Sequence, residues 1–477
     1  MRLTATARAC VGTLSAVALV SATLAAPALA DDSTGHHTFA PGSQGIGDPY
    51  FPLEGNGGYD AQRYNLALRY DPSTHKLGGT VTMRALATQD LSRFDLDLSG
   101  YRVSAVQVDG AAATFTRSGQ ELQITPARGL VSGHRFTAAV TYAGVPKTVV
   151  GSPIVFGAPY GWIYTEDGAF VGCEPNAAHT WFPSSDHPRD KASFRFAITV
   201  PTGRQVVANG AYRGHHVSGD SDTYVWAEQQ PMATYLATVD IGRWAFHQTT
   251  TGRGISEFVA VDPTLAKEAT RKDTVGLTSR ITDYWAKTFG SYAFGSTGAI
   301  VDNVPDIGFS LETQTRPLYG FVPDPVTASH ELSHEWFGDS VSVESWKDIW
   351  LNEGFATFSE WLWAEHDGGM STWRQARREF ADTPADDTYW KQSIADPQRD
   401  GMFSGAVYKR GGLTMAALRH KIGDKAFFRL LRLWVRIHQH GNASTADFRR
   451  LAGEVSGQRL GHFFHTWLWR QAKPSHL

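Results

Sequence analysis

Hydrophobic and polar residues alternate along much of the first half of the chain, from about Gly58 to Trp244. Tyr64, Leu66, Leu68 and Tyr70 alternate with polar neighbours, and a two-residue period is typical of a half-buried β-strand. Similar runs lie at residues 94–98, 103–108, 136–142, 194–200 and 223–226, with turn dipeptides between them such as Asp109-Gly110 and Asn209-Gly210. The pattern predicts an antiparallel β domain.

The period becomes helical after Asp262-Pro263. Leu277, Ile281 and Trp285 stand four residues apart and Gly290 follows as a C-cap, and helical patterns then dominate to the end of the sequence. We therefore predict an α+β multidomain chain. It comprises a loosely ordered lead-in over residues 31–57, an N-terminal antiparallel β domain over residues 58–246, and a mainly helical domain over residues 247–477.

The first thirty residues have a different pattern. Arg2 and Arg8 precede an apolar stretch over residues 11–24, and Ala28-Leu29-Ala30 follows it. This is the pattern of a secretory signal peptide with a small-residue cleavage site, here residues 1–30. A retained membrane helix is disfavoured because the stretch is short and rich in Ala and Ser. We expect an exported, extracellular protein without a membrane anchor after cleavage.

Composition narrows the function classes. The 44 basic and 47 acidic residues form no long run of one sign, so nothing marks a nucleic-acid surface or a polybasic membrane anchor. The two cysteines are Cys10, within the predicted signal peptide, and Cys173. The mature chain therefore has neither an intrachain disulfide nor a cysteine-rich structural zinc site.

One motif carries the candidate chemistry: His330-Glu331-Leu332-Ser333-His334. On a helix, which Asp324 would cap and Gly338 would end, the two imidazoles lie about one turn apart and reach a single metal ion, with Glu331 beside it as general base. Glu353 follows His334 after 18 residues on a second predicted helix, which ends before Gly368-Gly369. Two His and one Glu leave one tetrahedral position open, as in catalytic zinc sites, so we expect one Zn²⁺.

The spacing of these residues resembles that of the gluzincin aminopeptidases, the family of aminopeptidase N and leukotriene hydrolase. The resemblance extends to Val407-Tyr408-Lys409-Arg410-Gly411, a variant of a family motif, which implies that Tyr408 stabilises the oxyanion. It covers most of the chain. Many relatives continue into a large helical C-terminal domain, and we expect this chain to be a short form without it.

The resemblance also implies two substrate-binding carboxylates. The family binds the substrate amine through a Gly-x-Met-Glu-Asn motif, where this chain has Phe309-Ser310-Leu311-Glu312-Thr313. Glu312 is kept, whereas the Gly, Met and Asn are not, which puts the shape of the first side-chain pocket in doubt. Glu174 stands at the second position, ahead of Trp181-Phe182-Pro183. Both carboxylates would pair with a free ammonium, which an internal peptide bond lacks.

These inferences predict a secreted zinc metallo-aminopeptidase that hydrolyses the N-terminal peptide bond of peptides through zinc-activated water. Two alternatives remain open: a thermolysin-like endopeptidase, which needs no amine anchor, and a zinc-holding peptide-binding protein without catalysis. Thr357 and Glu360, one and two turns beyond Glu353, are equally compatible with orienting the ligands and with a solvated or core-lining position.

Overall fold

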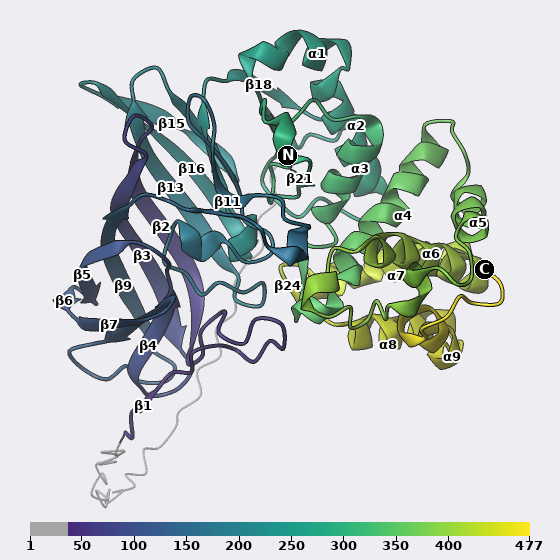
Figure 1. Cartoon of the computed structure of the whole chain (residues 1–477), viewed down its shortest axis with the longest axis horizontal. Helices are drawn as coiled ribbons and strands as arrows, with labels where there is room; N and C mark the ends of the chain where they lie inside the picture. The colour runs from purple at the N-terminus through teal and green to yellow at the C-terminus, as the bar shows by residue number, and fades with distance from the viewer. Residues whose placement is uncertain (1–36) are drawn as a thin grey trace, which may run out of the picture. The chain divides into compact units, whose positions relative to one another are not determined.

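A computed structural model describes residues 37–477, and Thr38–Leu477 form one compact unit (Figure 1). The predicted signal peptide, residues 1–30, lies outside the described residues. None of the helices in the described range combines the length and hydropathy needed to cross a bilayer.

The first half of the compact unit is built from strands, as predicted. Its largest sheet has eight strands in the order β15-β16-β13-β2-β3-β9-β5-β6 (Figure 1), all antiparallel except the β2–β13 pair. In β2 the apolar positions Tyr64, Leu66 and Leu68 are buried while their neighbours are at least partly exposed. The bounds are Tyr59–Asp71 (β2), Lys76–Ala87 (β3), Arg102–Val108 (β5), Ala111–Ala112 (β6), Arg135–Gly144 (β9), Ala192–Pro201 (β13), Ala211–Ser218 (β15) and Ser221–Met232 (β16).

Two smaller sheets complete this half. One has the order β1-β4-β8-β7, with bounds Ala40–Pro41, Leu91–Asp97, Glu121–Thr125 and Thr114–Ser118. The other has the order β10-β11-β12-β17-β14, with bounds Thr148–Val149, Tyr160–Tyr164, Ala169–Gly172, Val239–Gly242 and Gln205–Ala208. The Asp109-Gly110 turn joins the paired strands β5 and β6, with both residues at positive φ. Asn209-Gly210 instead joins β14 and β15, which belong to different sheets.

The second half begins with a mixed five-stranded sheet of order β18-β19-β20-β22-β21, with bounds Ala245–Thr250, Ser256–Val261, Thr297–Val301, Leu318–Tyr319 and Ser310–Leu311. A short pair, β23 (Val341–Val343) and β24 (Gly441–Ala443), lies further along the chain. The helices are Ala266–Arg271 (α1), Thr274–Thr288 (α2), Pro325–His334 (α3), Trp350–His366 (α4), Thr372–Asp382 (α5), Gly405–Ile422 (α6), Asp424–His438 (α7), Thr445–Ser456 (α8) and Gly461–Phe464 (α9). The predicted fold class is confirmed, and the boundary at residue 246 stays a prediction.

The predicted lead-in, residues 31–57, includes a segment that makes long-range contacts. We call residues 48–56 the strap. Asp48 is buried and accepts hydrogen bonds from the Ser345 hydroxyl at 2.8 Å and from the Trp346 backbone N–H at 3.0 Å. The Tyr50 hydroxyl donates to Asp396 at 2.5 Å. The strap therefore attaches the start of the β half to the helical half, through contacts about 300 residues apart in sequence.

Candidate metal centre and active site

Helix α3 positions the two histidines. Asp324 caps it by accepting hydrogen bonds from the backbone N–H groups of Val326 and Thr327 at 2.7 and 3.1 Å. His330 and His334, one turn apart, have ring centroids separated by 4.9 Å. The helix ends at His334, earlier than the predicted stop at Gly338, where φ is +138°. Both imidazoles thus lie in the last turn and a half of α3.

Glu353 comes from the first turn of α4, and its carboxylate lies between the two rings. Its Oε2 atom is 3.3 Å from His330 Nε2 and 3.7 Å from His334 Nε2. Glu353 and His334 are almost completely buried. The ligand atoms of the three residues lie within 4.8 Å of one another. The structure therefore brings together the three residues that the sequence predicted as ligands.

Hydrogen bonds on the far side of each ring orient it toward this point. His330 Nδ1 lies 2.7 Å from a Glu360 carboxylate oxygen, and His334 Nδ1 lies 3.0 Å from the Phe337 carbonyl oxygen. When each Nδ1 carries the proton, both Nε2 lone pairs face the Glu353 carboxylate. Three converging lone pairs repel one another unless a cation lies between them, and two imidazoles with one carboxylate are a donor set that zinc prefers. The residues present fit one zinc ion.

The surroundings favour positive charge at this point. Burial lowers the pKa of His330, yet hydrogen bonds to Glu353 and Glu360 raise it well above its ordinary value. Glu331 lies on the adjoining face of α3, where its carboxylate is within 4.8 Å of ligand atoms of Glu312 and His334. Burial raises the pKa of Glu331 to about 7. Glu331 is thus a buried carboxylate placed against the metal centre.

Glu312 and Glu174 lie together beside the ligands. Their carboxylate oxygens and one of Glu353 fall within 4.8 Å of one another, although the two glutamates come from segments more than 130 residues apart. Each has an Oε1 atom that is buried and that no described residue reaches with a hydrogen bond. Burial and the neighbouring carboxylates raise the pKa of both groups well above the usual range. A group with several N–H donors and a positive charge would satisfy both.

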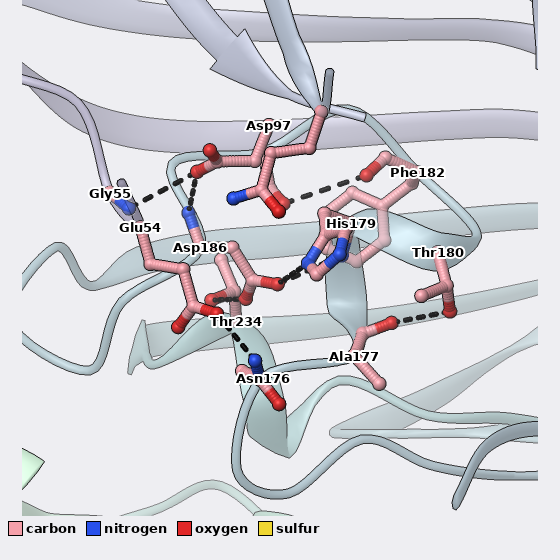
Figure 2. Close-up of polar contacts among 12 residues, drawn as sticks. Glu54, Gly55, Asp97, Asn176, Ala177, His179, Thr180, Phe182, Asp186 and Thr234 are labelled. Carbon is pink, nitrogen blue, oxygen red and sulfur yellow. Dashed lines mark hydrogen bonds and ion pairs between the residues drawn. The ribbon is translucent and has the colours of Figure 1, made fainter. Parts of the chain in front are cut away.

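A buried polar network fixes the loop that carries Glu174 (Figure 2). The Asn176 side-chain amide donates to Glu54 of the strap at 2.5 Å. His179 Nδ1 lies 2.8 Å from Asp186, whose backbone N–H donates to Asp97 at 2.8 Å. These contacts connect the loop to the strap and to β4, so they hold the loop and with it Glu174 in position.

Tyr408 lies in the first turn of α6, with its ring 6.0 Å from that of His330 and inclined to it by 18°. Glycines allow α6 to approach α4 closely at this level. A Cβ atom built on Gly411 would lie 2.5 Å from the Cα of Gly354, the residue next to Glu353. A side chain at either glycine would therefore separate the two helices.

Two features escaped assignment from the sequence. From the sequence, Glu360 was compatible with several environments. In the structure its carboxylate is hydrogen-bonded to His330, one of the predicted zinc ligands. The close approach of α4 and α6 at Gly354 and Gly411 was also not assigned. The one signal for it in the sequence is the presence of a small residue on each of the two helices. The Thr357 hydroxyl is buried and has no hydrogen-bond partner among the described residues, and its methyl group would lie 2.9 Å from a Cβ atom built on Gly412.

Comparison with protein-family models matches both halves of the chain. Residues 60–236 match the peptidase M1 N-terminal domain, and residues 325–467 match the peptidase family M1 domain. Together these segments cover well over half of the chain.

Among curated proteins, a probable aminopeptidase 2 of Sulfurisphaera tokodaii is 24% identical over 80% of this chain and 50% of its own length. The glutamyl aminopeptidase of Bos taurus is 26% identical over 66% of this chain and 36% of its own length. The chain thus spans half or less of these relatives.

A solved structure matches over nearly its full length. The M1 zinc metallopeptidase from Deinococcus radiodurans superposes with a TM-score of 0.83 at 28% identity, covering 90% of this chain and 98% of its own. A glutamate-to-alanine mutant of that enzyme has been solved with a Tyr-Ser-Ala substrate bound. The family models, the relatives and this match agree with the geometry of the metal centre, and the chain belongs to the M1 family of zinc metallopeptidases, the gluzincin aminopeptidases.

Proposed function

We propose that this chain is a zinc aminopeptidase that releases the first residue of peptides with a free N-terminus. The observation that carries the proposal is the pair Glu174 and Glu312, two carboxylates next to the predicted zinc ligands, each with one buried oxygen that has no hydrogen-bond partner among the described residues. A substrate ammonium placed between them gains charge-assisted hydrogen bonds that an internal peptide nitrogen cannot make. The pair would therefore hold the substrate N-terminus at a fixed distance from the metal centre, so that the first peptide bond is the one hydrolysed.

The remaining residues are arranged for hydrolysis of that bond. Zinc held by His330, His334 and Glu353 would supply a Lewis acid for the scissile carbonyl. Glu331, whose carboxylate lies near Glu312 and His334, would accept the proton of the attacking water and pass it to the leaving amine. Tyr408, whose phenol lines the same cleft as Glu174, would donate a hydrogen bond to the developing oxyanion.

The Deinococcus relative supports a peptide substrate, since a mutant of it has been solved with the tripeptide Tyr-Ser-Ala. The endopeptidase alternative leaves Glu174 and Glu312 without a role. The alternative of a non-catalytic binding protein leaves Glu331 and Tyr408 without one.

Hydrolysis of leucyl-p-nitroanilide and its N-acetyl counterpart tests the proposal. We expect cleavage of the free-amine compound only, loss of that activity with a chelator, and its return with added zinc. Cleavage of the acetylated compound would remove the role of Glu174 and Glu312 and favour an endopeptidase. Tight binding of the free-amine compound by zinc-loaded protein without turnover would favour the binding protein.

We also propose that the chain is exported. The support is the sequence pattern of residues 1–30, with Arg2, Arg8, the apolar stretch and the Ala28-Leu29-Ala30 motif. Amino-terminal sequencing of protein recovered from the culture medium should begin at Asp31. Protein retained inside the cell and still beginning at Met1 would contradict export.

A further inference from the structure

A cleft of about 530 Å³ opens beside the metal centre, between the two halves of the compact unit. Glu174 lies on its wall from the β half, and Tyr408 from the helical half. The loop that precedes Glu312 contributes Ile307, Phe309 and Leu311. The cleft is therefore bordered both by the proposed amine anchor and by the proposed oxyanion donor.

This position identifies which part of a substrate would fill the cleft. In an N-terminal residue, one Cα atom carries the amine, the scissile carbonyl and the side chain. When the amine lies at Glu174 and the carbonyl at Tyr408, the side chain of that first residue must occupy space that adjoins both. Among the described residues, the cleft is that space.

The walls of the cleft are mainly apolar. Phe309, Leu311 and Phe403 line it. Tyr160 also lines the cleft, and because its hydroxyl already donates to the Asn176 side chain at 3.0 Å, its ring is the part left to contact a ligand. Glu174 is the one charged residue among the described residues that line the cleft. The described lining therefore offers no cation to pair with a substrate carboxylate, and Glu174 would repel one.

Phe156 completes the cleft from the loop between β10 and β11. Its side chain is 74% exposed, which is unusual for a residue of this size, and its backbone has a left-handed φ of +54°. An exposed aromatic ring at the edge of an apolar groove gains contact area when a ligand covers it.

We propose that the cleft selects peptides whose first residue is bulky and apolar, aromatic above all, and that Phe156 is a specificity-determining residue that packs on this side chain. The inference rests on the proposed aminopeptidase function. It separates this chain from an acidic specificity, such as the name of its glutamyl aminopeptidase relatives denotes, because the described lining offers no cation.

The test compares kcat/KM for phenylalanyl, leucyl, alanyl, lysyl and glutamyl p-nitroanilides. We expect the phenylalanyl compound to exceed the alanyl compound by about tenfold or more, and the glutamyl compound to be the poorest. Phe156→Ala should reduce the phenylalanyl-to-alanyl ratio by about fivefold to tenfold. The control Val217→Ala, which removes an exposed apolar side chain on β15, should leave the ratio as it is.

Competition adds a readout that is independent of turnover. Free L-phenylalanine should inhibit cleavage of the alanyl compound at lower concentration than L-alanine does, and Phe156→Ala should reduce that difference. Normal cleavage of the alanyl compound with no phenylalanyl preference, or a preference for the glutamyl or lysyl compound, would overturn the inference alone. Failure to cleave any of the five compounds with zinc present would instead overturn the proposed function.

Discussion

Glu331 is the residue on which the proposed proton transfers depend. Its carboxylate is buried beside Glu312 and His334, and an amide of the same shape cannot accept a proton. Glu331→Gln should therefore lower kcat by about a thousandfold or more while zinc remains bound. Turnover and zinc content of the same dialysed preparation check this. Near-normal turnover would show that another group is the base.

Tyr408 should act on the rate rather than on substrate binding. Its ring lies 6.0 Å from the His330 ring, where a phenol would meet an oxyanion that exists only during reaction. Tyr408→Phe should lower kcat by about a hundredfold and change KM by less than about threefold. Steady-state kinetics on leucyl-p-nitroanilide measure both. A raised KM with unchanged kcat would make Tyr408 a binding residue only.

Glu360 is a positioning residue that acts through His330. Because its carboxylate accepts the His330 Nδ1 hydrogen bond at 2.7 Å, Glu360→Gln should weaken zinc affinity by about tenfold. Competition with a calibrated chelator measures this affinity. Glu365→Gln, on the same helix but lining a separate pocket, is the matched control. Equal affinities in the two variants would leave Glu360 without this role.

At the scale of residues, the sequence predicted the zinc ligands through helical periodicity. His330 and His334 share a helix face, and Glu353 belongs to a helix with clear ends. Glu174, Glu312 and Tyr408 have no such local relation, because they come from two loops and another helix. Only the resemblance to a family identified them in advance, and the structure places all three beside the ligands.

At the scale of elements, the crossing of α4 and α6 sets the position of both Glu353 and Tyr408. Gly411→Ala would place a Cβ atom 2.5 Å from the Gly354 Cα, so the helices must separate. We expect a loss of about 1–3 kcal/mol in stability together with a large loss of kcat. Thermal unfolding and kinetics check this.

Gly405→Ala is the matched control for that substitution. Gly405 begins the same helix, and a Cβ built there has no neighbour within 4 Å. Gly405→Ala should leave the thermal unfolding temperature and kcat near the wild-type values. If Gly411→Ala behaves like this control, the close approach of the helices is unimportant for the site.

Element types were largely predictable, whereas element ends were less so. The strands and the helices that carry the site follow from periods of two and 3.6 residues. Helix α3 ends at His334 rather than near Gly338, and the Phe337 carbonyl oxygen, three residues further on, lies 3.0 Å from His334 Nδ1. This contact is local, but the spacing of apolar and polar residues does not reveal it.

At the scale of the whole molecule, the strap joins the β half to the helical half. Burial would raise the pKa of Asp48, but hydrogen bonds from His187, Tyr50, Ser345 and Trp346 lower it to about 2. A folded-state pKa below the unfolded value of 3.8 means that Asp48 contributes stability above pH 4. This contribution is lost as the pH falls toward 2.

Asp48→Asn should therefore cost about 2 kcal/mol at pH 7 and only about 1 kcal/mol at pH 3. Denaturant unfolding of both proteins, with a chelator present at both pH values, measures the difference without a contribution from zinc. A cost that stays constant between the two pH values would show that the Asp48 charge is not what stabilises the strap.

The order of the strap could not be predicted, because its partners lie about 300 residues away. Its sequence, which contains Pro49, Pro52 and Gly55, has no strand or helix period, and regular periodicity was the signal available. The same holds for the cleft, whose walls come from loops of both halves. Nonlocal contacts of this kind appear only in the folded chain.

The central claim is that this metal centre removes residues one at a time from a free N-terminus. Mass spectrometry of a zinc-loaded reaction with a pentapeptide of five different residues tests it most directly. The account predicts that the tetrapeptide lacking the first residue appears first and the tripeptide later, and that the N-acetylated pentapeptide stays intact. Internal cleavage products, or cleavage of the acetylated peptide, would contradict it.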